Sequence, residues 1–238
     1  MSTAKFIDQL EYPESDGQPM GETDTHRKWM IRIHDILNYR YRQERVYTAS
    51  DLLVYYEPGQ VTRFVVPDVF LVLDSDPGER RIFKIWEEER VPNVVIEVTS
   101  KSTSHQDLVA KPQIYERIGV QEYFLFDPTS EYLLPALRGF RLCDGILTEI
   151  EAERSVLTCE TLNIDLSLIG GRLEMFDRDT GKKLLTEAEA NLHDADEQRR
   201  NVEEQRRYAD EQRAARLQAE ERIRELEAEL LRHRRGEG

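Results

Sequence analysis

Residues 94–111 read VVIEVTSKSTSHQDLVAK, and the rest of the chain is organised around this stretch. Its first five residues are apolar apart from Glu97, which predicts a buried strand. A turn rich in serine and threonine follows, and then a helix over about 107–118 that Gly119 ends. A carboxylate inside an apolar strand is costly unless a cation meets it. Glu97 is therefore either a functional residue or one half of a structural ion pair with arginine or lysine.

A second acid, Asp68, follows Pro67 at the head of another apolar run, 69–73. Two carboxylates on neighbouring strands, with a lysine nearby, are the groups that a divalent metal site for phosphodiester hydrolysis needs. Glu22, near the start of a predicted helix, is a candidate third carboxylate. The backbone carbonyl of Val98 is a further candidate, because hard cations also accept backbone oxygen as a ligand. These residues predict a site for Mg²⁺ or Mn²⁺.

The composition narrows the class of protein. Charged residues make up 34% of the 238 residues and the net charge is −14, which argues against a broad basic surface for nucleic acid. Only Cys143 and Cys159 are present, so we expect an intracellular, cytoplasmic protein with free thiols, although a bridge between the two stays open. No apolar run has the length of a membrane span.

The hydrophobic pattern predicts a mixed α/β fold. A helix should begin near Thr23 or Asp24 and carry one apolar stripe, made of Trp29, Met30, Ile33, Ile36, Leu37 and Tyr41. Short β-rich runs follow at 46–48, 52–56, 65–73, 82–86 and 94–98. After the helix at 107–118, a strand at 122–126 is closed by Asp127-Pro128, which predicts a strand–helix–strand crossover onto a mixed sheet. Weaker strand patterns lie at 133–134, 137–142, 147–150, 161–169 and 173–177.

The composition shifts near residue 184, so we expect a first domain over 1–183 and a charged helix over 184–238. The tail repeats every seven residues, as DEQRRNV, EEQRRYA and DEQR from residue 196 onward, which is typical of a coiled coil. One register places Ala188, Ala195, Val202, Ala209, Arg216, Ile223 and Leu230 on a seam, with Asn191, Gln198, Gln205, Gln212, Ala219 and Leu226 beside it. This predicts a helix that self-associates and helps to make a homodimer. The alternative is a solvated single helix with Glu–Arg pairs.

Several of these motifs, in this order and spacing, resemble the bacterial Uma family of restriction endonucleases, in the PD-(D/E)xK nuclease-like superfamily. The resemblance covers roughly residues 10–185. It rests on Pro67-Asp68, VVIEVTS at 94–100, Asp107, Lys111, Tyr115, GVQEY at 119–123 and Asp127-Pro128.

The resemblance implies a restriction-endonuclease-like core, with a mixed β-sheet flanked by helices, and a Mg²⁺-dependent site that cuts double-stranded or structured DNA. Asp68 and Glu97 would be metal ligands and Lys111 a displaced catalytic lysine. Glu22 would match the acid of the family's N-terminal helix.

The sequence departs from the superfamily's pattern at one position. The lysine normally lies two residues after the second acid, where this chain has Thr99. Lysine must come from elsewhere, either from Lys111 or from Lys101. Pro112 disfavours helical dihedral angles at Lys111, so an alternative to the helix over 107–118 is one that begins at Pro112, with the proline in its first turn.

Other polar residues near these motifs have simpler interpretations. His26 is expected to be a surface or packing histidine, and Tyr115 to pack in the core. Turn and cap roles are expected for Ser100, Ser102, Thr103 and Ser104, because no motif supplies a histidine–acid pair for nucleophilic catalysis.

The sequence is consistent with two different functions. The first is a metal-dependent DNA endonuclease, in which Glu97→Ala abolishes divalent binding and leaves the fold intact because a clustered carboxylate is removed. The second is a nuclease-fold module with a degenerate site, which acts in assembly or regulation through its C-terminal helix.

Overall fold

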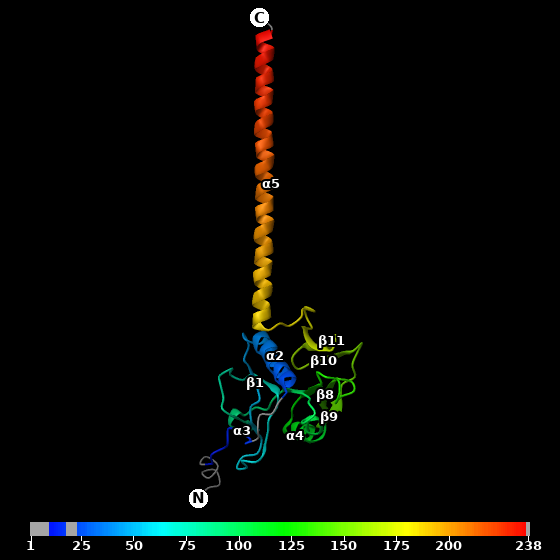
Figure 1. Cartoon of the computed structure of the whole chain (residues 1–238). Helices are drawn as coiled ribbons and strands as arrows, with labels where there is room; N and C mark the ends of the chain where they lie inside the picture. Colours follow the sequence, from blue (N-terminus) through cyan, green and yellow to red (C-terminus); the bar gives the residue numbers. More distant parts are fainter. Residues whose placement is uncertain (1–9, 18–22, 237–238) are drawn as a thin grey trace. The chain divides into compact units, whose positions relative to one another are not determined.

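The computed structural model describes residues 10–17 and 23–236, and it describes side chains as far as residue 231. The chain divides into two compact units, Met1–Glu187 and Ala188–Gly238. Within its described residues the first unit is a mixed α/β domain, and the second unit is one long helix (Figure 1). The expected fold class, a mixed sheet flanked by helices and followed by a long C-terminal helix, is confirmed.

A six-stranded sheet forms the centre of the first unit. Its order is β1-β4-β6-β7-β8-β9. The strands are β1 (Val46–Ser50), β4 (Val69–Leu73), β6 (Val94–Val98), β7 (Glu122–Phe126), β8 (Leu137–Cys143) and β9 (Ile146–Glu149). Only the β6–β7 pair is parallel, and the helix between these strands makes the predicted crossover.

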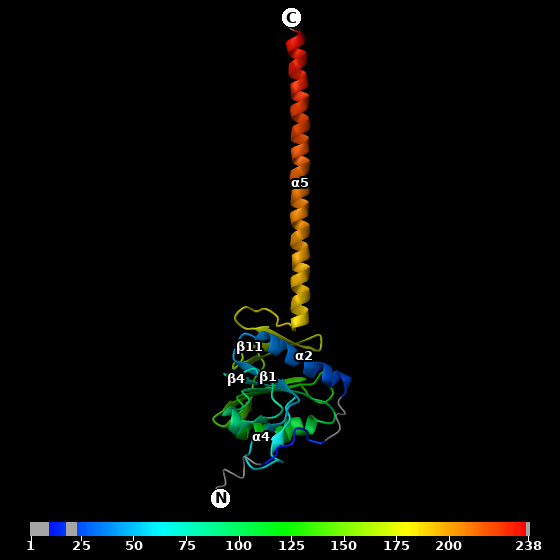
Figure 2. The same cartoon turned by 90° about the vertical axis from the view of Figure 1, so that its left-hand side faces the viewer.

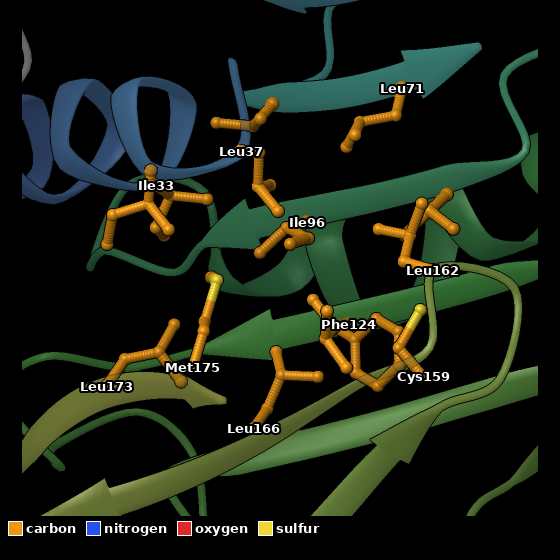
Figure 3. Close-up of a cluster of buried hydrophobic side chains, with 14 of the residues drawn as sticks. Ile33, Leu37, Leu71, Ile96, Phe124, Cys159, Leu162, Leu166, Leu173 and Met175 are labelled. Carbon is orange, nitrogen blue, oxygen red and sulfur yellow. The ribbon is translucent and has the colours of Figure 1, made fainter. Parts of the chain in front are cut away.

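The central strands are buried on both faces, and alternate residues serve two different cores. Val94, Ile96 and Val98 of β6 belong to one hydrophobic cluster, and Val95 belongs to the other. Glu97 must therefore point to the same face as Val95. The first cluster joins α2 and the main sheet to a small sheet, as Ile33, Ile96, Phe124 and Met175 show in Figure 3.

Helix α2 (Asp24–Arg40) begins and packs as its sequence predicts. The Thr23 side chain accepts a hydrogen bond from the His26 backbone N–H, so Thr23 is the N-cap. Ile33, Ile36 and Leu37 are buried, and Trp29 and Met30 pack partly buried against the same cluster. Both views place α2 beside β11 of the small sheet (Figures 1 and 2).

The crossover helix covers the predicted range of about 107–118. A π-helical turn, η1 (Gln106–Ala110), leads directly into α4 (Lys111–Ile118), and Lys111 has helical dihedral angles. The alternative start at Pro112 is therefore wrong. The Lys111 N–H bonds to the Gln106 carbonyl, and this wider turn accommodates the proline ring that a regular α-helix would exclude. Gly119, with φ of 88°, ends α4 as predicted.

The smaller strands differ from the expected ones at several positions. Residues 65–73 form two strands, β3 (Phe64–Val65) and β4, because Pro67 interrupts the run. Residues 82–86 divide into β5 (Phe83–Lys84) and the short helix α3 (Ile85–Glu88), and β2 (Val54–Tyr55) pairs with both β3 and β5. Residues 133–134 form no strand.

The small sheet contains one strand that the sequence pattern did not predict. Its strands are β10 (Val156–Cys159), β11 (Ile164–Ile169) and β12 (Arg172–Asp177), and β10 is the unpredicted one. The buried carboxylate of Glu122 connects this sheet to the main sheet, because it accepts hydrogen bonds from the N–H groups of Glu160 and Thr161 and from the Cys159 thiol. Cys159 is buried and Cys143 is exposed, and both are free thiols.

Asp127 ends β7 and supports a mutational prediction. Its buried carboxylate accepts hydrogen bonds from the backbone N–H groups of Thr129, Ser130, Tyr132 and Leu133. Burial acts to raise the pKa of Asp127, but these donors outweigh it and hold the pKa below its ordinary value. We expect Asp127→Ala to lower the free energy of unfolding by about 2–3 kcal/mol near neutral pH.

This stabilisation should be present above the carboxyl pKa of the unfolded chain and should disappear as the pH falls through the lower folded-state pKa. Urea unfolding of wild type and variant at about pH 7 and about pH 3 measures it. A difference between the two proteins that stays constant with pH would contradict the assignment to the ionised carboxylate.

Helix α5 (Glu187–Gly236) is a single helix of 50 residues. All of its side chains from 196 to 231 are exposed. Among the described helices, α5 included, none is long and apolar enough to cross a membrane.

Candidate active site

Asp68 lies at the edge of β4 and is held by the neighbouring strand. Its Oδ2 accepts a hydrogen bond from the Val98 N–H at 2.7 Å, and its own N–H donates to Glu97 Oε2 at 3.1 Å. His26 Nε2, on α2, is 3.1 Å from the same Oδ2. The Asp68 side chain is 16% exposed, so solvent and a ligand can reach it.

Glu97 lies beside Asp68 and is completely buried. Lys111 Nζ donates to Glu97 Oε2 at 2.8 Å, and the Tyr115 hydroxyl donates to Glu97 Oε1 at 2.6 Å. Both donors come from α4, which covers the sheet face to which Glu97 points. The carboxylate is therefore held between the sheet and the crossover helix.

Lys111 contacts a third acid, Asp107. Lys111 Nζ is 3.1 Å from Asp107 Oδ1, and Asp107 is fully buried although Lys111 is 13% exposed. The Lys111 charge and hydrogen bonds from Thr103 and Lys111 act to lower the pKa of Asp107 against the effect of burial. Asp107, Lys111 and Tyr115 are four residues apart, so the π turn and α4 present them together.

The electrostatics of this cluster keep the Lys111 side chain charged. Burial raises the pKa of Glu97 and of Asp107, because a charged carboxylate loses its hydration there. Burial also acts to raise the pKa of Asp68, but the His26 hydrogen bond and the Lys111 charge lower it on balance. Burial acts to lower the pKa of Lys111, yet the surrounding carboxylates raise it above its ordinary value, so Lys111 stays an ammonium. Three acids thus share one cation.

The structure brings together some of the predicted site residues and separates others. Asp68, Glu97 and Lys111 are in direct contact, and Val98 joins them through its backbone N–H. Lys101 is exposed in the turn after β6, and no hydrogen bond or ion pair joins it to either acid among the described residues. Glu22 lies outside the described residues.

Two expectations change. His26 was expected to be a surface or packing histidine; it is buried, and it also contacts Asp68, because the first turn of α2 lies near the start of β4. Tyr115 was expected to pack in the core; it does so, and it also binds Glu97. Its hydroxyl stays protonated, because burial and the Glu97 charge raise the pKa of Tyr115.

The expectation that Glu97→Ala leaves the fold intact also changes. It assumed that repulsion among carboxylates dominates, but Glu97 is paired with Lys111 and bonded to Tyr115. Removal of Glu97 would leave both donors buried without this acceptor. The serines and threonines of the turn have the expected local role, since the Ser100 N–H bonds to Thr103 Oγ1.

The donor set suits a hard divalent cation. Carboxylate oxygens are the preferred ligands of Mg²⁺ and Mn²⁺, and the cluster holds the carboxylates of Asp68, Glu97 and Asp107. Among the described residues, only His193, Asp194 and Glu197 bring three possible ligand atoms within 4.8 Å of one another, and these residues are exposed on α5. At the candidate active site, Asp68 and Glu97 are the two predicted metal ligands that the structure brings into contact.

A family model and a solved structure are similar to this chain. Residues 7–169 match the model of the Uma2 family, described as "Putative restriction endonuclease". One similar solved structure is a "putative nuclease belonging to DUF820" from Anabaena variabilis ATCC 29413. It is 16% identical, with a TM-score of 0.46, and the match covers 68% of this chain and 90% of that chain. The search of curated proteins found no significant match.

Proposed function

The chain belongs to the Uma2 family, and from this premise we propose that it is a Mg²⁺- or Mn²⁺-dependent endonuclease that hydrolyses phosphodiester bonds of double-stranded or structured DNA in the cytoplasm. The observation that carries the proposal is the contact of Asp68 with Glu97 across two strands, with Lys111 on Glu97. Two acids and one lysine are the groups that this reaction needs.

In this proposal Asp68 and Glu97 hold the metal, and the Val98 carbonyl and Glu22 complete its ligands. The bound metal would compensate negative charge on the attacking and leaving oxygens. Lys111 keeps its proton and presents an ammonium next to Glu97, where it orients water or stabilises charge on the phosphate. Lys111 thereby replaces the lysine that is missing at Thr99.

The neighbouring residues position these groups. Val98 and His26 both hold Asp68 Oδ2, which leaves the orientation of the carboxylate fixed. Tyr115 holds Glu97 Oε1 in the same way. A site whose groups are fixed before the substrate arrives loses less free energy in ordering them.

Titration calorimetry with Mn²⁺ tests the metal site. We expect Asp68→Asn to weaken Mn²⁺ binding at least tenfold while the fold survives, because asparagine keeps the shape and one acceptor oxygen but loses the charge. Asp194→Asn, in the exposed group on α5, is the matched control and should leave this binding unchanged. Circular dichroism verifies the fold of both variants.

The titration is repeated with a short DNA duplex, since a metal can require a phosphate oxygen as a ligand. Equal Mn²⁺ binding by wild type and Asp68→Asn, with and without duplex, would contradict the proposed site. Loss of binding in Asp194→Asn alone would assign the metal to α5.

A second function is favoured by the long helix α5, which the proposed chemistry does not use. According to this second function, the chain retains the nuclease fold but has a degenerate site, and it acts in assembly or regulation through α5. Cleavage of supercoiled DNA with Mg²⁺ or Mn²⁺ separates the two functions, because only the first requires it.

A further inference from the structure

Helix α5 exposes large apolar side chains to solvent. Those in its last described turns include Ile223, Leu226 and Leu230, which are 55%, 44% and 59% exposed. Their spacings of three and four residues place them on one side of the helix. An exposed apolar stripe of this kind marks a surface that another protein covers.

The spacing also matches the seam of a coiled coil. In the seven-residue repeat abcdefg, Ile223 and Leu230 take position a and Leu226 takes position d. In parallel coiled coils, an isoleucine at a followed by a leucine at d favours two strands over three or four. Nearer the start of the helix, glutamine occupies d at Gln198, Gln205 and Gln212, so the apolar contact is concentrated at the other end.

The charges beside the seam identify the partner. In a parallel pair, each g residue faces the e residue five positions later on the other helix. Asp194 then faces Arg199, and Arg222 faces Glu227, so both pairs have opposite charges when the partner is an identical helix. An antiparallel pair of full-length helices would instead place the apolar end of one helix, around Leu226, against the Ala195 and Gln198 end of the other.

We propose that α5 pairs with α5 of a second copy of this chain in a parallel, in-register, two-stranded coiled coil whose main contact is Ile223, Leu226 and Leu230. The polar d residues make the pairing weaker toward the start of the helix and select the register. This proposal does not depend on nuclease activity, because it rests on residues outside the first unit.

Sedimentation equilibrium of the full chain tests the pairing. We expect a dimer that Leu226→Glu weakens at least tenfold. Leu217→Glu is the matched control, because Leu217 is 58% exposed but lies at position b, away from the seam. A monomeric wild type, a trimer, or equal loss of dimer in both variants would overturn the proposal. Circular dichroism confirms that each variant stays helical.

Charge reversal tests the orientation. Arg222→Glu and Glu227→Arg should each weaken the dimer, and the double variant should restore it, because the opposite charges then face each other again. Arg222 also pairs with Glu225 of its own helix at 2.8 Å, so the helical content of each variant is compared. Failure of the double variant to recover would overturn parallel pairing.

A cysteine pair gives an independent readout. In a Cys143→Ser background, Ala219→Cys at position d should form a disulfide between copies, while Ala214→Cys at the outward position f should not. Cys159 is buried and does not compete. Cross-linking through Ala214→Cys alone, or through neither residue, would overturn the parallel register.

Discussion

Glu97→Ala is expected to lower the free energy of unfolding by about 3–5 kcal/mol, because it breaks a buried ion pair by removing one partner. Glu97 is fully buried and accepts hydrogen bonds from Lys111 and Tyr115. Without it, the Lys111 ammonium keeps Asp107 as its buried counter-charge, and the Tyr115 hydroxyl loses its acceptor. Urea unfolding followed by circular dichroism measures the loss.

Glu97→Gln is the matched variant, because glutamine keeps the side-chain volume and one acceptor oxygen for a donor from α4. We expect it to cost less stability than alanine and still to weaken Mn²⁺ binding, since an amide carries no charge. A loss below about 1 kcal/mol for Glu97→Ala would mean that water replaces the carboxylate and that the buried ion pair does not stabilise the fold.

Lys111→Met is expected to reduce DNA cleavage by about 10²–10³-fold if the proposed chemistry is right, because it removes a charge positioned at the reacting phosphate. Lys101→Met is the matched control. Lys101 is exposed, whereas Lys111 contacts Glu97. Only Lys111→Met therefore removes a cation from the site. The rate of DNA cleavage is measured as the rate at which supercoiled plasmid is cut in the presence of Mg²⁺ or Mn²⁺.

Mn²⁺ binding separates a catalytic from a structural role of Lys111. Lys111→Met leaves Glu97 and Asp107 without their ammonium partner, so a divalent cation should bind at least as well as in wild type. Retained metal binding with lost cleavage supports a catalytic lysine. Lost cleavage in Lys101→Met, with full activity in Lys111→Met, would assign the displaced lysine to the turn instead.

The parts of the site that could be predicted from sequence are those fixed by local pattern. The apolar run around Glu97 predicted a buried strand, and β4 and β6 are neighbours as expected. Thr23 and Gly119 were recognised as helix ends because capping depends on residues nearby in the chain.

Other parts depend on packing between distant segments. His26 reaches Asp68 from 42 residues away, and only the position of α2 on the sheet brings the two together. Asp107 was one of the residues of the family resemblance, but no role was predicted for it, and the structure buries it in the π turn before Pro112. Local propensity carries no information about such a turn.

The burial of an acid in an apolar strand was an incomplete guide to function. Glu122 is as buried in β7 as Glu97 is in β6. Backbone N–H groups, a thiol and Arg141 satisfy Glu122, and hydrogen bonds from Thr161 and others hold the pKa of Glu122 below its ordinary value against the effect of burial. The two glutamates differ in their hydrogen-bond partners. These partners come from other elements of the fold, so the sequence of each strand alone does not identify them.

The division of the candidate active site between a strand and a helix has a consequence for how the site comes into being. The strands supply Asp68 and Glu97, but the crossover supplies Asp107, Lys111 and Tyr115. A folding intermediate with a finished sheet and an undocked crossover would therefore carry clustered acids with no counter-charge. Docking of α4 supplies the ammonium and buries Glu97 in a single event, so assembly of the site and closure of the second hydrophobic cluster are one cooperative step.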